Sequence, residues 1–214
     1  MVASFSKLLD AQRGFSFRLD GPLDMRINQS ENIQTAADIL NWASRERLEN
    51  ILRRFGDEPH FGAIADAIVS HRRKKIITSS VELAKLITDA IAKPFPGKFR
   101  GIHPATRAFQ ALRMAVNDEL LHIEQGLKAA FHQLRLEGLL IAVCFHAIED
   151  KMVKAFVNNL VESKKTINQF VICIYLGGKG RFINEKCLYP SSSEVLENPS
   201  ARSAKLRAVR KISA

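Results

Sequence analysis

Apolar and polar positions follow a helical period through the first half of the chain. From Thr35 the stretch TAADILNWASRERLENILRRFG places apolar residues every three to four positions, as an amphipathic helix does. Thr35 followed by Asp38 is typical of a helix start, and Gly56 is a stop signal. The pattern therefore predicts one helix over this stretch, with Trp42 or Ala43 on its buried face.

Two more helices are expected before the pattern changes. One spans about residues 61–73, and another opens after Thr78 or Ser79. The second ends before KPFPGKFRG, whose prolines and glycines mark a linker. The block of about 35–95 is thus predicted to be all-helical.

Beyond the linker the pattern predicts an α/β region. Pro104 opens the longest helical pattern, which runs until Gly138 breaks it. The continuous apolar runs 139–145 and 169–176 fit strands buried on both faces, as in a parallel sheet, and an amphipathic helix at about 148–161 lies between them. An open doubly wound sheet normally has about five or more strands. We therefore expect that another chain completes the sheet, or that this is part of a larger fold.

Charge adds a class of partner to this outline. The chain of 214 residues has a formal net charge of +10, with basic residues gathered in HRRKK (71–75) and in an acid-free tail. Such patches suit a polyanion such as a nucleic acid, because neutralised phosphates release counterions. An anionic lipid surface, or a protein that is merely basic, remains an alternative. No apolar run is long enough to span a bilayer, the N-terminus lacks a secretory signal, and the three cysteines are expected to be buried reduced thiols.

One candidate for chemistry is CFHAIED, at the carboxyl end of the 139–145 strand. Ligand sites in open α/β sheets lie at this end of the strands, which favours a functional role for His146, Glu149 and Asp150. The alternative is that the three residues only stabilise the start of the next helix. Spacing alone does not choose between these interpretations.

A polar stripe runs beside the apolar one on the helix after Pro104. Its members, with two neighbours, are His103, Thr106, Arg107, Gln110, Arg113 and Asn117. They could line a cleft and bind phosphate or a base edge, although a solvated helix face is the simpler interpretation. GGKG (177–180) lacks the spacing of a phosphate loop and is expected to be a turn.

The stretch RGFSFRLDGPLDMR (13–26) is too apolar for a solvated loop and too charged for a core strand. It is followed in order by TAAD, FGDE, HPATRAFQALRMAVNDEL, FHAIED and NPSARSAKLRA. Together these motifs closely resemble the RsmH (MraW) family. Its members are S-adenosylmethionine-dependent methyltransferases of the N4 amine of a cytidine in small-subunit ribosomal RNA.

The resemblance implies a class I, Rossmann-like methyltransferase sheet with an inserted all-helical domain. Residues 1–30 would lead from the methyltransferase domain into the insertion, 31–100 would form the helical, substrate-recognising insertion, and 101–214 would be the C-terminal half of the α/β domain with a basic tail. The family's earlier region, with its glycine-rich cofactor loop, has no counterpart here. The resemblance therefore implies a truncated chain that binds S-adenosylmethionine poorly and has no appreciable activity alone.

The resemblance also assigns roles to residues, with no metal ligand among them. Catalytic roles are expected for Asp24, His146, Glu149 and Asp150. Cofactor contacts are expected for Lys7, Arg13 and Phe15. Substrate contacts are expected for Arg18, Asp20, Arg26, His103, Thr106, Arg107, Gln110, Arg113 and Asn117.

The implied partners are small-subunit ribosomal RNA or a 30S-like particle, without a membrane. A dimer or a complementing N-terminal half is a further expectation, and the implied location is the cytoplasm, or the mitochondrial matrix for a eukaryotic relative. The alternatives are a non-catalytic RNA-binding or ribosome-assembly remnant of the enzyme, and a split enzyme whose first half is a separate chain.

Overall fold

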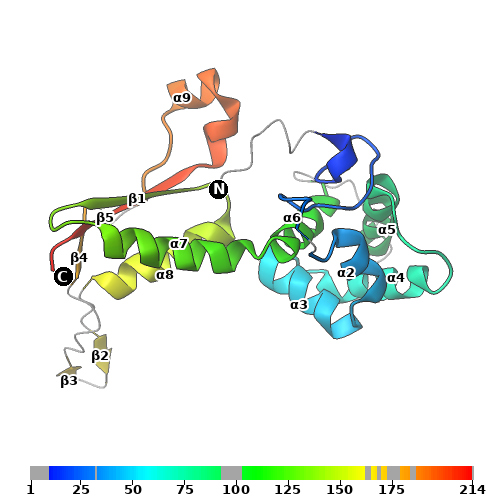
Figure 1. The fold of residues 1–214 in the computed structure, drawn as a ribbon, viewed down its shortest axis with the longest axis horizontal. Coiled ribbons are helices and arrows are strands. Elements are labelled where there is room, and N and C mark those ends of the chain that lie inside the picture. The colour runs from blue at the N-terminus through cyan, green and yellow to red at the C-terminus, as the bar shows by residue number, and fades with distance from the viewer. Residues whose placement is uncertain are drawn as a thin grey trace. The chain divides into compact units, whose positions relative to one another are not determined.

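A computed structural model describes residues 10–31, 33–92, 103–161, 165–167, 170–172, 179–183 and 187–213. The chain divides into two compact units, Met1–Glu119 and Leu120–Ala214 (Figure 1). Each unit is described separately. No helix among the described residues is long and apolar enough to cross a membrane.

The first unit is built from helices, as its sequence period predicts. In chain order they are η1 (Ala11–Arg13), α2 (Ala36–Trp42), α3 (Arg45–Gly56), α4 (Phe61–Arg72), α5 (Ser80–Ala92) and α6 (Ala105–Val116). Thr35 and Asp38 form the expected capping box at the start of α2.

The single helix predicted from Thr35 to Gly56 is wrong, because it is two helices. The first helix ends before Ala43, which is extended, and the Ser44 hydroxyl caps α3 by accepting a hydrogen bond from the Arg47 N–H. The break also settles which residue is buried: Ala43 enters the core, whereas Trp42 is 76% exposed.

The stretch 13–26 belongs to the core of the first unit. Leu23 and Met25 are fully buried, and Phe15 and Phe17 pack against the same cluster. Met25 lies in the left-handed region with φ 58°. At Gly14 a Cβ atom would lie 1.9 Å from the Pro22 carbonyl oxygen, so only glycine permits this close approach. The apolar residues of this stretch are therefore explained by burial.

The second unit contains helices and a small sheet. Its elements are α7 (Glu119–Gln133), β1 (Leu139–Cys144), α8 (Ala147–Leu160), β2 (Lys165–Ile167), β3 (Phe170–Ile172), β4 (Gly180–Phe182), α9 (Ser192–Glu197), η2 (Pro199–Ser203) and β5 (Lys205–Lys211). The long helix predicted after Pro104 is also two helices, α6 and α7. They are separated at Asp118, which has φ 45°. The domain boundaries near residues 30 and 100 stay a prediction.

The sheet differs from the parallel arrangement that the apolar runs predict. The order is β1-β5-β4, and β1 pairs antiparallel with β5, with Ile141 opposite Ala208. Of the second predicted strand, the structure describes residues 170–172, which form β3. This strand pairs antiparallel with β2 in a separate two-stranded sheet. No parallel strand pair occurs among the described residues. The described residues therefore do not confirm the predicted βαβ unit, and residues 169 and 173–176 of its second strand lie outside them.

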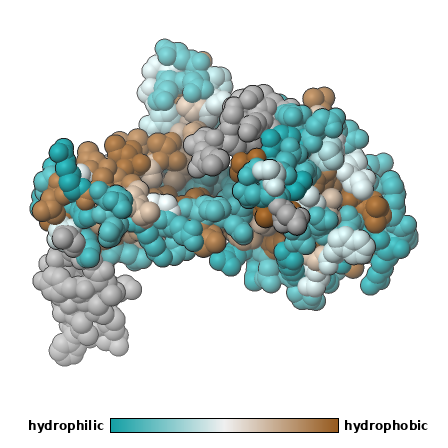
Figure 2. All heavy atoms as spheres, viewed as in Figure 1, coloured by the Kyte–Doolittle hydropathy of each residue, from teal (hydrophilic) through white to brown (hydrophobic). Residues whose placement is uncertain are grey.

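The two faces of β1 differ in burial. One face, which includes Leu140 and Cys144, packs with residues of α7 and α8. The other face exposes Leu139, Ile141 and Val143, and apolar side chains gather over this part of the sheet in Figure 2. The expectation that this strand is buried on both faces is therefore wrong, because Leu139, Ile141 and Val143 are 43%, 56% and 52% exposed.

The expectation of buried reduced thiols is confirmed for Cys144, whereas Cys187 is reduced but only partly buried. Cys144 and Cys187 are free thiols, and burial raises the pKa of Cys144 to about 11. Cys144 is therefore an unreactive core residue at neutral pH. Cys173 lies outside the described residues.

Candidate functional site

Asp24 lies at the centre of the first group of predicted site residues. Its two carboxylate oxygens accept hydrogen bonds from Nε and Nη2 of Arg26, both at 2.8 Å. Gln29 donates to the same carboxylate at 3.2 Å. These contacts, chiefly the Arg26 side chain, lower the pKa of Asp24 to about 2. A carboxylate with so low a pKa binds protons weakly, so the geometry favours an orienting role over a proton-accepting one.

Two other predicted site residues hold the backbone beside Asp24. The Arg13 guanidinium donates to the carbonyl oxygens of Arg26 and Ile27 at 2.5 and 2.7 Å, and it lies over the Phe15 ring. The Asn117 side chain donates to the Met25 carbonyl at 2.8 Å and accepts from the Ile27 N–H at 2.7 Å. Arg13 and Asn117, which lie far apart in sequence, therefore clamp the same turn.

Aromatic contacts join the same stretch to the start of α6. Phe17 stacks on His103 with the ring centroids 4.4 Å apart, and it meets Phe109 edge-on at 5.0 Å. His103 also accepts the Ala105 N–H. Phe17 was not among the predicted site residues, although its place in an apolar segment beside Arg18 gave a signal for it.

The polar stripe of α6 is engaged mostly within the protein. Arg113 forms a two-point ion pair with Glu119 at 2.7 and 3.0 Å. The Arg107 guanidinium lies 3.4 Å from the Asp57 carbonyl, and Gln110 contacts the sulfur of Met114. Thr106 is half-buried on the same helix. The predicted cleft lining is thus in part a set of structural contacts, and Glu119 is a partner that the sequence analysis missed.

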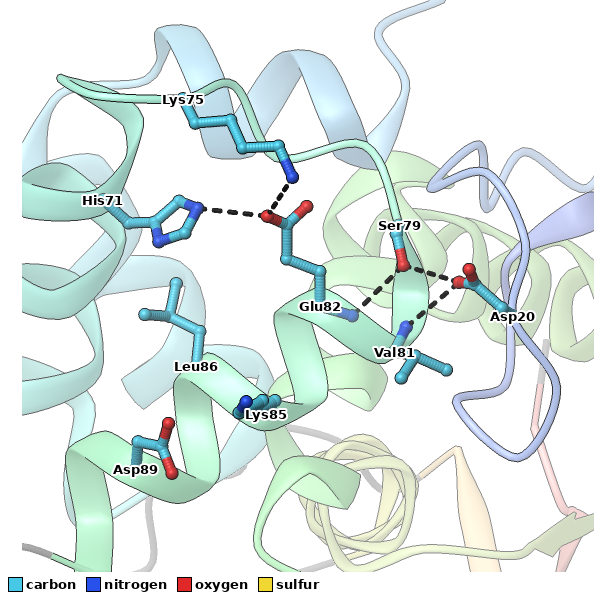
Figure 3. A pocket seen from close by; sticks show the side chains of 9 residues that line it. All are labelled: Asp20, His71, Lys75, Ser79, Val81, Glu82, Lys85, Leu86 and Asp89. Atoms are coloured by element: carbon cyan, nitrogen blue, oxygen red, sulfur yellow. Dashed lines mark hydrogen bonds and ion pairs between the residues drawn. The ribbon is translucent and has the colours of Figure 1, made fainter.

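Asp20 lies in a different place from Asp24. It lines an open cavity of about 510 Å³ together with residues of α4, α5 and the loop between them, among them His71, Lys75, Glu82 and Lys85 (Figure 3). The Ser79 hydroxyl donates to Asp20 at 2.5 Å, which lowers the pKa of that carboxyl. Asp24 does not line this cavity.

The cavity wall carries its own charge network. Glu82 accepts a hydrogen bond from Lys75 at 2.9 Å and lies 3.2 Å from Nε2 of His71 (Figure 3). The pKa of Glu82 is lowered, and the Lys75 hydrogen bond is the main cause. Arg18 is exposed and does not line the cavity. The structure therefore divides the predicted residues of the first unit into a group around Asp24 and a separate position at Asp20.

The predicted residues of the second unit gather at the start of α8. One Glu149 oxygen lies 3.0 Å from Nε2 of His146, and the other accepts the Phe145 N–H at 2.8 Å. Burial opposes ionisation of Glu149, but the His146 contact and the backbone donors outweigh it, so its pKa lies below the usual value. His146 and Glu149 therefore do stabilise the start of α8, as one interpretation of CFHAIED predicts. A catalytic role for these residues stays a prediction.

Asp150 is neutralised by two residues of the basic tail that were not among the predicted site residues. Arg207 donates a hydrogen bond to Asp150 at 2.7 Å, and the Lys205 ammonium lies 3.4 Å from the same carboxylate. The pKa of Asp150 is lowered, mainly by the Arg207 hydrogen bond. Both basic residues come from β5. They lie in the motif NPSARSAKLRA and in the basic tail, which were the available signals. Lys7, predicted to contact the cofactor, lies outside the described residues.

Comparison with known proteins defines the class. The model of the MraW methylase family matches residues 2–212. The chain therefore belongs to the MraW methylase family, which confirms the resemblance found in the sequence. Its relatives include proteins named ribosomal RNA small subunit methyltransferase H from Ehrlichia canis and from the Wolbachia of Brugia malayi, which are 41% and 42% identical to it. A protein of that name from Roseobacter denitrificans is 44% identical.

These matches cover nearly all of this chain but not all of the relatives. They include 98%, 98% and 92% of this chain, against 67%, 59% and 58% of the three relatives in the same order. The chain thus spans about three fifths to two thirds of the length of these proteins.

Proposed function

We propose that this chain supplies the substrate-recognising and C-terminal part of an S-adenosylmethionine-dependent methyltransferase. Its product would be a cytidine methylated at N4 in small-subunit ribosomal RNA. The observation that carries the proposal is the family match over residues 2–212. The proposed architecture is a class I sheet interrupted by the helical segment of residues 31–100.

Methyl transfer to the N4 amine of cytidine requires groups that orient this weakly nucleophilic amine and later accept its proton. Asp24 is an ionised hydrogen-bond acceptor with a low pKa, which suits orientation. In the second unit Glu149 and Asp150 are ionised at neutral pH because their pKa values lie below the usual range. We propose catalytic roles for Asp24 in the first unit and for His146, Glu149 and Asp150 in the second.

The described residues do not by themselves fit S-adenosylmethionine, whose sulfonium would supply the methyl group. Arg13 directs its donors to the backbone carbonyls of Arg26 and Ile27, so its Nη2 is already used by the protein. Phe15 lies beneath the same guanidinium. We propose that Arg13 and Phe15 support the cofactor site indirectly, by holding the backbone of residues 26 and 27. The rest of its lining would come from the part of the relatives that this chain does not match.

The open face of β1 supports a complementing partner. Leu139, Ile141 and Val143 are exposed on an edge strand, and such a surface is typically covered by another element. We propose that the cofactor half of the enzyme covers it, either in a longer chain or as a separate one, and that a dimer is the alternative. Because the proposed substrate is ribosomal RNA, the proposed place of action is the cytoplasm, or the mitochondrial matrix for a eukaryotic relative.

A chimera tests the proposal. Residues 10–213 would replace the matched region of the Ehrlichia canis relative, and N4-methylcytidine would be measured by nucleoside mass spectrometry after incubation with small-subunit particles and S-adenosylmethionine. We expect methylation by the chimera and none by the 214-residue chain alone. A folded chimera that binds S-adenosylmethionine but forms no N4-methylcytidine would refute the proposed reaction.

The net charge of +10 also supports a second candidate, a non-catalytic RNA-binding or assembly role. It predicts salt-dependent binding of this chain to small-subunit RNA with no methylation by the chimera. Methylation by the chimera would decide against it.

A further inference from the structure

The only tryptophan of the chain is on the surface. Trp42 ends α2 and exposes 76% of its area, although a tryptophan side chain gains much free energy from burial. The neighbouring Ala43 takes the core position that the helical period offered to either residue. The exposed indole therefore contributes little to the core and is available to a ligand.

Hydrogen bonds tie the basic run 71–75 and the loop after it to the end of α2, the helix that Trp42 ends. Arg72 donates from Nη1 to the Leu40 carbonyl at 2.8 Å, which ties the end of α4 to the end of α2. The Asn41 side chain donates to the Ile77 carbonyl at 2.8 Å and accepts the Ile77 N–H at 2.9 Å. Trp42 and Ile76 directly follow and precede these two paired residues, and both are exposed. The chain segments that carry these two apolar side chains and the basic run are therefore joined by fixed hydrogen bonds.

The free positive charge of this surface comes from the run 71–75. Arg45, which is close to Trp42 in sequence, is neutralised by Glu49 and Asp66. Arg73 and Lys74 are exposed, and no ion pair involves either of them in the described part of the chain. An exposed aromatic face beside unpaired cations is the combination that binds single-stranded nucleic acid, because bases stack on the ring and phosphates meet the charges.

We propose that Trp42, Ile76 and the exposed part of the run 71–75 form a binding surface for single-stranded RNA. A base stacks on the indole, and the adjoining phosphates lie against Arg73 and Lys74. The inference rests on the proposed function, since it names the surface by which an RNA-modifying enzyme holds an unpaired segment. It adds an anchor on the helical unit that involves none of the residues proposed to have catalytic roles.

The single tryptophan makes the proposal directly measurable. The 214-residue chain would be titrated with a fluorescein-labelled oligouridylate of about twelve nucleotides, within the range of single-stranded sites. Anisotropy reports binding, and a parallel titration with unlabelled oligonucleotide follows the quenching of Trp42 by stacking. We expect quenching in parallel with binding. Trp42→Ala is expected to weaken binding about fivefold or more, whereas Trp42→Phe keeps most of the affinity.

A matched pair of lysine variants tests the charges. Lys74→Ala should make the dependence of log affinity on log salt shallower by about 0.7, the value for one phosphate contact to a single strand. Lys154→Ala removes another exposed lysine, which belongs to the second unit, and should leave this slope unchanged. Circular dichroism establishes that each variant is folded.

The outcomes separate this inference from the proposed function. RNA binding that is equal in wild type and Trp42→Ala, without quenching, would overturn the surface and leave the methyltransferase proposal standing. Absence of oligouridylate binding, or Trp42-dependent binding to vesicles of phosphatidylcholine and phosphatidylglycerol with none to RNA, would overturn it as well. Quenching by RNA together with a chimera that binds cofactor but forms no N4-methylcytidine would retain the surface and refute the proposed reaction.

Discussion

The two units differ in how completely they bury their apolar side chains. Among the described residues, 23 buried hydrophobic residues form the core of the first unit, and 5 form the cluster beneath the sheet of the second. The first core is enclosed by α2 to α6 and the stretch 13–26. The second covers one face of a three-stranded sheet and leaves the other face exposed. A stable core of its own is therefore expected for the first unit, and a need for a covering partner for the second.

The largest expected effect tests this contrast with two aliphatic truncations. Leu40 is fully buried in the first unit, so Leu40→Ala should lower the free energy of unfolding by about 2–5 kcal/mol. Ile141 is 56% exposed in the second unit, so Ile141→Ala should lower it by only about 1 kcal/mol or less. Urea denaturation followed by circular dichroism measures both, and Trp42 fluorescence follows the first unit. Equal losses of unfolding free energy in the two variants would show that the two units do not differ in burial as described.

The next effect concerns the clamp on the stretch 13–26. Asn117→Ala removes the side chain that bonds the Met25 carbonyl and the Ile27 N–H, and it leaves both backbone groups without that partner. A loss of about 1–3 kcal/mol of unfolding free energy is expected. Thr106→Ala, on the same helix, provides the control, since it should cost less. If the two variants proved equally stable, Asn117 would not be holding this turn.

The sequence predicted the helices of the first unit well because their signals are local. Thr35 and Asp38 marked the start of α2, and apolar spacing placed α4 and α5. The break after Trp42 was missed even though Ser44 is a good helix cap, because the apolar period continues across it. A stronger weight on Ser44 would have separated α2 from α3.

The sheet could not be predicted in the same way because its pairing is non-local. The run 139–145 was correctly predicted as a strand, but its partner β5 lies more than sixty positions later, in a tail whose charges concealed its alternation. Asp150 shows the same limit at the candidate site. Its partners Arg207 and Lys205 come from β5 and cannot be deduced from the spacing of CFHAIED.

A smaller effect depends on pH and on the Asp24–Arg26 pair. The folded-state pKa of Asp24, about 2, lies below the unfolded value of about 3.9, so the pair stabilises the fold above the unfolded pKa. This contribution is lost as the pH falls through the folded pKa. Asp24→Asn should therefore cost about 1–2 kcal/mol at pH 7 after allowance for solvent screening, and the difference from wild type should shrink between about pH 4 and pH 2. Urea unfolding at several pH values measures the difference. A penalty that stays constant over this range would show that the Asp24 charge is not its source.

The smallest effect on stability gives the sharpest test of the open sheet face. Ile141→Thr combined with Val143→Thr keeps β-branched residues in β1 but removes apolar surface from two side chains that are about half exposed. In the isolated chain the free energy of unfolding should stay within about 0.5 kcal/mol of wild type, while light scattering at high protein concentration should fall, because an exposed apolar edge strand promotes association. In the chimera, where the proposed cofactor half covers this face, the same pair should instead be destabilising. A loss of stability in the chimera alone separates a face that is covered by a partner from one that is merely exposed. Equal behaviour in the chain and the chimera would contradict the proposed covering.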